Sequence, residues 1–167
     1  LSNGPLVVGV LGERSLTVSL ENLECIYALL PGGGTAGALP VNTGDVAAFT
    51  PNCSVDPIPT KSNGTLNNIL LAQTMALDLN VQYDADLPDL NISNSCVGFS
   101  SEVTDNLPPD ATISDLLSLA NQTLAGLVTV NYSALSDVVA SINEYFDECS
   151  FSCVGENANE NESNSEG

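Results

Sequence analysis

The chain has 167 residues and a formal net charge of −19, because 21 acidic residues face only two basic ones, Arg14 and Lys61. Nucleic-acid binding needs Lys and Arg to neutralise phosphates, and docking on anionic lipid needs a polybasic segment, so the composition excludes both. The chain also lacks histidine, which removes Ser-His and Cys-His catalytic pairs and His-ligated metal centres. No apolar run approaches the ~18 residues of a membrane span, so we expect no membrane insertion.

The apolar content of 43% can supply a core of ordinary size for one domain. Five cysteines and six Asn-x-Ser/Thr sequons indicate secretion into an oxidising compartment. We therefore expect one extracellular domain over residues 1–154, followed by an acidic polar tail over residues 155–167.

The first half of the chain favours short strands and loops. Residues 6–11 and 15–20 are β-rich, and the turn candidate Gly12-Glu13 between them predicts an antiparallel hairpin. Asn22 is a candidate cap for a predicted short helix over residues 23–30, which Pro31 and three glycines would end. Residues 35–46 and 50–64 are typical of loops, with a brief buried segment at 46–49.

The second half favours helices. Apolar periodicity predicts a largely buried helix over residues 65–79, followed by a short strand at 80–83. A capping box at 112–115 begins a second helix that ends at Gly126, and a third apolar stripe runs from Leu135 to Cys149. The expected fold class is α+β: a small antiparallel sheet or partial barrel, made from the N-terminal hairpin, packed with about three amphipathic helices.

Four segments in order resemble a module of secreted bacterial surface proteins: LLPGGGTAGAL (29–39), NILLAQTMALDLNV (68–81), TISDLLSLANQTLAG (112–126) and LSDVVASINEYFD (135–147). The resemblance implies a non-enzymatic extracellular module. The chain also resembles the protomers of environmental extracellular fibrils, which implies subunits linked by an extended N-terminal segment that inserts into the next subunit.

The apolar run at the N-terminus is the candidate subunit interface, comprising Leu6, Val7, Val8, Val10 and Leu11. It fits two structures: the first strand of a hairpin within its own domain, or a donor strand that completes a neighbour's sheet. Both are compatible if residues 1–5 cross to the neighbour and the hairpin stays in its own subunit. A head-to-tail contact of this kind does not close and gives a filament.

Polar and sulfur-containing residues supply the remaining candidates. The acidic turn with Asp84, Asp86 and Asp89 has the oxygen ligands that calcium prefers, but it lacks the glycine and the distal Glu of an EF-hand loop, which favours a solvated acidic turn. The sequons make six asparagines candidates for covalent glycans: Asn52, Asn63, Asn91, Asn121, Asn131 and Asn161. The disulfide candidates are Cys25, Cys53, Cys96, Cys149 and Cys153, which allow at most two internal bridges, with the fifth thiol either buried or bridging subunits.

Enzyme activity has little support in this sequence. A glycosidase needs a carboxylate pair and usually aromatic subsites, and a Lys-Asn isopeptide needs a buried lysine, whereas Lys61 lies in a loop-like stretch. We therefore expect a structural subunit, without a cofactor, of an extracellular or cell-surface fibre that polymerises with itself. The alternative is a monomeric module of a secreted surface protein that binds carbohydrate or calcium.

Overall fold

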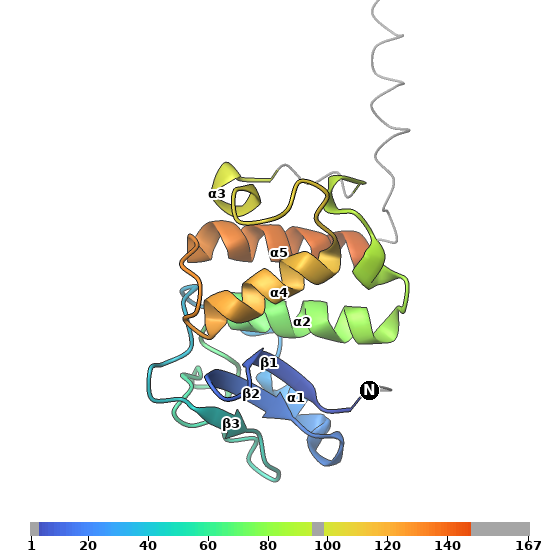
Figure 1. The fold of residues 1–167 in the computed structure, drawn as a ribbon. Coiled ribbons are helices and arrows are strands. Elements are labelled where there is room, and N and C mark those ends of the chain that lie inside the picture. The colour runs from blue at the N-terminus through green and yellow to red at the C-terminus, as the bar shows by residue number, and fades with distance from the viewer. Residues whose placement is uncertain (1–3, 95–98, 148–167) are drawn as a thin grey trace, which may run out of the picture.

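The computed structural model describes residues 4–94 and 99–147, which form an α+β fold with a three-stranded mixed sheet. Figure 1 shows three long helices gathered on one side of the sheet. The strands and helices, in chain order, are β1 (Leu6–Val10), β2 (Arg14–Val18), α1 (Glu24–Leu29), β3 (Asp45–Ala47), α2 (Ile69–Tyr83), α3 (Ser101–Thr104), α4 (Ile113–Leu124) and α5 (Tyr132–Asp147). Short 3₁₀ turns occur at Leu20–Asn22, Leu87–Asp89 and Ile92–Asn94.

The sheet has the order β1-β2-β3. The antiparallel hairpin of β1 and β2 is present as predicted, with Leu6 opposite Val18 and Val10 opposite Arg14. The brief segment predicted at 46–49 overlaps β3, which pairs with β2 in parallel and makes the sheet mixed. Leu20, predicted to continue the buried face of the second strand, lies beyond the end of β2 and is 52% exposed.

One continuous cluster of buried apolar side chains forms the core. Leu6 and Val8 of β1 lie in it with Leu16 and Val18 of β2, because alternate strand residues point to the same face. Helix α2 contacts β1, α4 and α5, and this central position explains its buried apolar residues. None of the described helices is long and apolar enough to cross a membrane.

Side chains at the N-termini of α2, α3, α4 and α5 accept hydrogen bonds from backbone N–H groups. The predicted Asn22 cap is wrong, because α1 has no side-chain cap and the Asn22 side chain bonds Ser19 and Thr50 instead. The predicted capping box of α4 is confirmed: the Asp115 N–H donates to Thr112 Oγ1, and the Thr112 N–H donates to Asp115 Oδ2. Asn131 accepts from the Ala134 N–H at 3.0 Å, so α5 begins at Tyr132, one turn before the predicted apolar stripe. These caps satisfy backbone donors that a helix start leaves without partners.

The predicted strand at 80–83 is wrong, because α2 continues to Tyr83. The Asp84 N–H donates to the Asn80 carbonyl at 2.9 Å, as expected of a continuing helix. The Asn80 side chain also donates to Asn143 Oδ1 of α5 at 3.0 Å. Packing between α2 and α5 therefore overrides the β-propensity of Val81 and Tyr83.

The glycine-rich segment after α1 lies against the start of α2. Gly33 N–H donates to the Leu66 carbonyl at 2.9 Å, and Asn68 bonds both the N–H and the carbonyl of Gly37. A Cβ at Gly32 would lie 2.6 Å from the Ala72 Cβ. The glycine-rich segment therefore has a packing role.

Two glycines of the hairpin provide a matched test of backbone strain. Gly9 and Gly12 have φ values of +93° and +87°, but a Cβ at Gly9 would lie 2.2 Å from the Arg14 carbonyl oxygen, whereas a Cβ at Gly12 meets nothing within 4 Å. We expect Gly12→Ala to lower the free energy of unfolding by about 1–2 kcal/mol, from the left-handed conformation alone. Gly9→Ala is expected to cost about 2 kcal/mol more, from the added overlap. Urea unfolding measures both, and equal losses would contradict the clash.

Candidate functional site

Strand β1 forms one edge of the sheet, and the hydrogen bonds of β2 show which of its backbone groups face outward. Ser15 N–H donates to the Gly44 carbonyl at 2.9 Å, and the Thr17 carbonyl accepts from Ala48 N–H at 3.0 Å, so these two residues of β2 face β3. Their partners across the hairpin are Gly9 and Val7. In an antiparallel ladder, directly opposite residues form two alternating kinds of pair. In one kind both residues point their N–H and carbonyl groups toward each other, and in the other kind both point them away. Val7 and Gly9 therefore point their N–H and carbonyl groups away from β2, to the outer edge.

Helix α4 covers one of these outward groups. The side chain of Asn121 accepts the Gly9 N–H at 2.9 Å, across 112 residues of sequence. Within the described residues, no hydrogen bond takes up the Val7 N–H or the carbonyls of Val7 and Gly9. The outer edge is defined here as these backbone groups of Val7 and Gly9. Gly9 is buried and Val7 is half-buried, so the edge offers another extended segment mainly the N–H and carbonyl of Val7.

A shallow groove of about 470 Å³ lies beside this edge. It is lined by Val10 of β1, by Leu127, and by one face of α4 that contributes Ser114, Leu117, Ser118, Asn121 and Gln122. Leu11 and Leu127 are 59% and 52% exposed. The edge thus combines backbone hydrogen-bonding groups with apolar surface, the two elements of strand recognition.

Arg14 brings a positive charge close to the groove. Its guanidinium donates to the Leu39 carbonyl at 3.0 Å and lies beside Gly126, where a Cβ would be 2.8 Å from Nη1. Gly126 precedes Leu127 of the groove. In a chain with a net charge of −19, this cation offsets part of the negative charge near the groove.

The predicted interface residues divide between the core and the surface. Leu6 and Val8 are fully buried in the chain's own core, and β1 pairs with β2 of the same chain. Val7 and Val10 are half-buried, and Leu11 is exposed at the hairpin turn. The strand itself is therefore part of its own domain.

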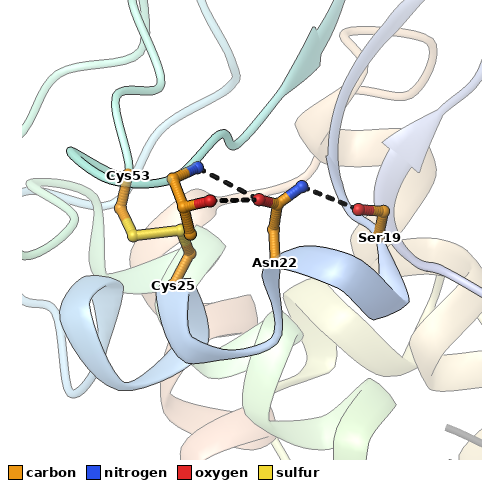
Figure 2. Close-up of a disulfide and its surroundings, with 5 residues drawn as sticks. Ser19, Asn22, Cys25 and Cys53 are labelled. Atoms are coloured by element: carbon orange, nitrogen blue, oxygen red, sulfur yellow. Dashed lines mark hydrogen bonds between the residues drawn. A yellow bond between two sulfur atoms is a disulfide. The ribbon is translucent and has the colours of Figure 1, made fainter.

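A disulfide joins Cys25 to Cys53, with the Cα atoms 5.2 Å apart. Figure 2 shows Asn22 beside this bond, donating to Ser19 Oγ. The Asn22 side chain also accepts from the backbone N–H and the hydroxyl of Thr50. The disulfide of Cys25 and the hydrogen bonds of the Asn22 side chain together hold α1 and the turn before it against the loop after β3. Such a bond is typical of proteins in oxidising compartments. Three other candidates, Cys96, Cys149 and Cys153, lie outside the described residues.

The sequon asparagines have different surroundings. Asn52 and Asn63 are exposed in loops, and Asn91 is half-buried and donates to the Asp110 carbonyl at 3.3 Å. Asn131 caps α5, and Asn121 bonds Gly9 while the hydroxyl of its partner Thr123 is fully buried. Asn161, like the predicted tail at 155–167, lies outside the described residues. The sequon pattern gave no sign that Asn121 supports the sheet edge.

The predicted calcium ligands follow α2. Asp84 ends that helix and accepts the Asp86 N–H at 3.0 Å, while Asp89 ends the 3₁₀ turn that buries Leu87. Among the described residues, no three or more His, Cys, Asp or Glu side chains form a group that could hold a metal ion.

A polar hollow of about 440 Å³ lies between α3 and α5, and the sequence did not predict it. Hydroxyl, amide and carboxylate side chains line it together with two apolar ones; the lining residues are Ser100, Glu102, Asn131, Ser133, Ala134, Asp137, Val138 and Ser141. Its members come from segments 30 residues apart, which local sequence patterns do not connect.

Asp78 of α2 is an acid with an altered environment. Burial raises the pKa of its carboxyl above the ordinary 3.8, and a hydrogen bond from Gln82 offsets part of this rise. The Gln82 Oε1 is buried, without a hydrogen-bond partner in the described structure. Because the folded state holds the Asp78 proton more tightly than the unfolded chain, this residue opposes folding at neutral pH.

Comparisons with protein-family models, with curated proteins and with solved structures found no match to this chain.

The disulfide generates a stability prediction. Because Cys25 and Cys53 are separated by 28 residues, loop-closure entropy predicts that Cys25→Ala with Cys53→Ala lowers the free energy of unfolding by about 3–4 kcal/mol. Urea unfolding of the oxidised proteins measures this loss. A loss under about 1 kcal/mol would contradict a bridge that stabilises the fold.

Asp78 generates a prediction on pH. Asp78→Asn removes the cost of a buried charge, so its free energy of unfolding at pH 7 is expected to exceed that of the wild type. This advantage should shrink as pH falls through the raised pKa of Asp78, where the wild-type carboxyl becomes neutral. The exposed residue Asp89 supplies the control variant Asp89→Asn. Chemical denaturation of the wild type and both variants from pH 7 to pH 3 measures these free energies of unfolding. A difference between Asp78→Asn and the wild type that does not change with pH would contradict the raised pKa of Asp78.

Proposed function

We propose that the protein is a non-enzymatic structural subunit of an extracellular filament or cell-surface fibre. Subunits join head to tail when the N-terminal segment of one copy lies along the outer edge of the next. The outer edge of β1 is the single observation that carries this proposal, because Val7 and Gly9 direct backbone groups away from their own sheet. The Cys25–Cys53 bridge supports an oxidising, extracellular location.

The donated segment is residues 1–5 rather than β1 itself. Withdrawing β1 would remove Leu6 and Val8 from the core and cost several kcal/mol. Five extended residues span about 17 Å, which matches the five residues of β1. The contact joins different surfaces of two copies, so it repeats without closing and produces a filament.

Charge favours this kind of joint over one made of ion pairs. Two basic residues cannot neutralise 21 acidic ones in a neighbouring copy. Backbone hydrogen bonds and the apolar groove do not depend on charge, and Arg14 beside the groove lowers the repulsion locally. The remaining negative surface keeps separate filaments apart.

The polar hollow favours a second candidate function, a monomeric module that binds calcium or carbohydrate. Glu102 and Asp137 supply hard oxygen ligands there, and the serines supply hydrogen-bonding groups for sugar hydroxyls. Size-exclusion chromatography at high protein concentration separates the candidates. A stable monomer whose melting temperature rises with calcium or an added glycan would favour the binding module.

The filament proposal predicts opposite defects in two variants. Val7→Pro removes the outward N–H without removing a hydrogen bond to β2, and edge strands tolerate proline. The Val7→Pro variant should donate its N-terminal segment to a neighbour but fail to accept a segment at its own edge. The variant that lacks residues 1–5 should accept a segment at its edge but have none to donate. Each variant alone is expected to be monomeric, and an equimolar mixture is expected to form a 1:1 dimer, as measured by light scattering and negative-stain imaging.

Val7→Ala is the matched control, because it keeps the backbone N–H and is expected to assemble like the wild type. Circular dichroism and melting of each variant check that the fold is retained. Filaments of normal length from folded Val7→Pro, or from the deletion variant, would overturn the proposed joint.

A further inference from the structure

Among the described sequon asparagines, Asn63 sits at the tip of a tight local turn. The Lys61 N–H donates to the Thr65 carbonyl at 2.8 Å, and the Gly64 N–H donates to the Lys61 carbonyl at 2.9 Å. Asn63 Oδ1 accepts both the N–H and the hydroxyl of Thr65, at 3.1 and 2.7 Å. All these bonds lie within five residues, and residues 61–64 are exposed.

This arrangement prepares the Asn63 amide for reaction. The two donors from Thr65 withdraw electron density from Oδ1, which makes an Nδ2 proton easier to remove. Nδ2 itself has no hydrogen bond in the described structure, and Asn63 is exposed. The Thr65 hydroxyl is the group that an Asn-x-Thr acceptor requires.

The four other described sequons lack this combination. At Asn52, the hydroxyl of Ser54 donates to Asp56 Oδ2 at 3.3 Å instead of to the asparagine. The Thr123 hydroxyl is buried and donates to the Leu119 carbonyl, while Asn121 is occupied by Gly9. Asn131 uses its oxygen to cap α5. Asn91 shares the local turn with Ser93, but its Nδ2 donates to the Asp110 carbonyl.

We propose that Asn63 is the preferred acceptor of an Asn-linked glycan. The co-reactant is a sugar activated as a lipid-linked pyrophosphate. Nδ2 bonds to the anomeric carbon, and the bond from that carbon to the pyrophosphate oxygen breaks. The lipid pyrophosphate leaves with the electron pair, and one Nδ2 proton passes to the solvent. Because the turn depends on five consecutive residues, it forms on a nascent chain before the long-range contacts of Asn121 exist.

The test is secretion of the full chain from a host that performs Asn-linked glycosylation. Site occupancy is measured by mass spectrometry of the intact glycopeptides, because the Asn63-Gly64 pair can deamidate and mimic enzymatic removal of a glycan. We expect the Asn63 peptide to be occupied in most molecules and more fully than the Asn121 peptide. An unmodified Asn63, or higher occupancy at Asn121, would overturn the proposal.

One variant tests the geometry rather than the motif. Gly64→Ala keeps the Asn-x-Thr sequence and meets no atom within 4 Å, but it disfavours the φ of +88° that closes the turn. Occupancy at Asn63 is expected to fall several-fold in Gly64→Ala. Ser62→Ala is the matched control, since it changes the neighbouring residue and leaves the turn intact. Equal occupancy in Gly64→Ala and Ser62→Ala would show that the turn does not select Asn63.

Discussion

The large excess of acidic over basic residues is the constraint on which the rest of the structure depends. A chain with 21 acids and two bases cannot join its segments through ion pairs, and asparagine amides make several of its long-range contacts instead. Asn22 holds Thr50, Asn68 holds Gly37, Asn121 holds Gly9, and Asn143 holds Gln73 of α2. An amide donates and accepts without carrying charge, so each contact adds no repulsion to a surface that is already negative.

These amides also explain how a small sheet remains attached to three helices. Apolar burial supplies most of the favourable free energy, but it is not directional and does not fix register. The bond from Gly9 to Asn121 fixes the edge strand against α4, and the Gly9 conformation brings that N–H to the helix. The same bond covers part of an edge that would otherwise be fully open to strand addition. The chain therefore limits, but does not abolish, pairing at this edge.

Short-range sequence patterns predicted the elements that short-range interactions define. The hairpin, the capping box of α4 and the apolar stripe of α5 follow from short-range turns, caps and periodicity. The predicted structure is wrong where a distant segment decides the conformation, as at Val81, which stays helical because α2 packs on α5. The parallel pairing of β3 and the disulfide partner of Cys25 are also non-local. The outward direction of the Val7 backbone groups is also non-local, because it follows from the hydrogen bond between Ser15 of β2 and the segment at β3.

Asparagine has two possible uses in this chain, and the structure around each sequon decides between them. A side-chain oxygen that accepts a distant or helical N–H, as at Asn121 and Asn131, ties the amide to the fold. At Asn63 the oxygen accepts only from its own Thr65, and the exposed nitrogen has no hydrogen bond within the described structure. The sequence motif is identical in the two cases, so the number of sequons overstates the number of available acceptors. Asparagine therefore has both roles in this chain. Its amide replaces ion pairs between segments, and it is also the residue type that would carry glycans on the surface.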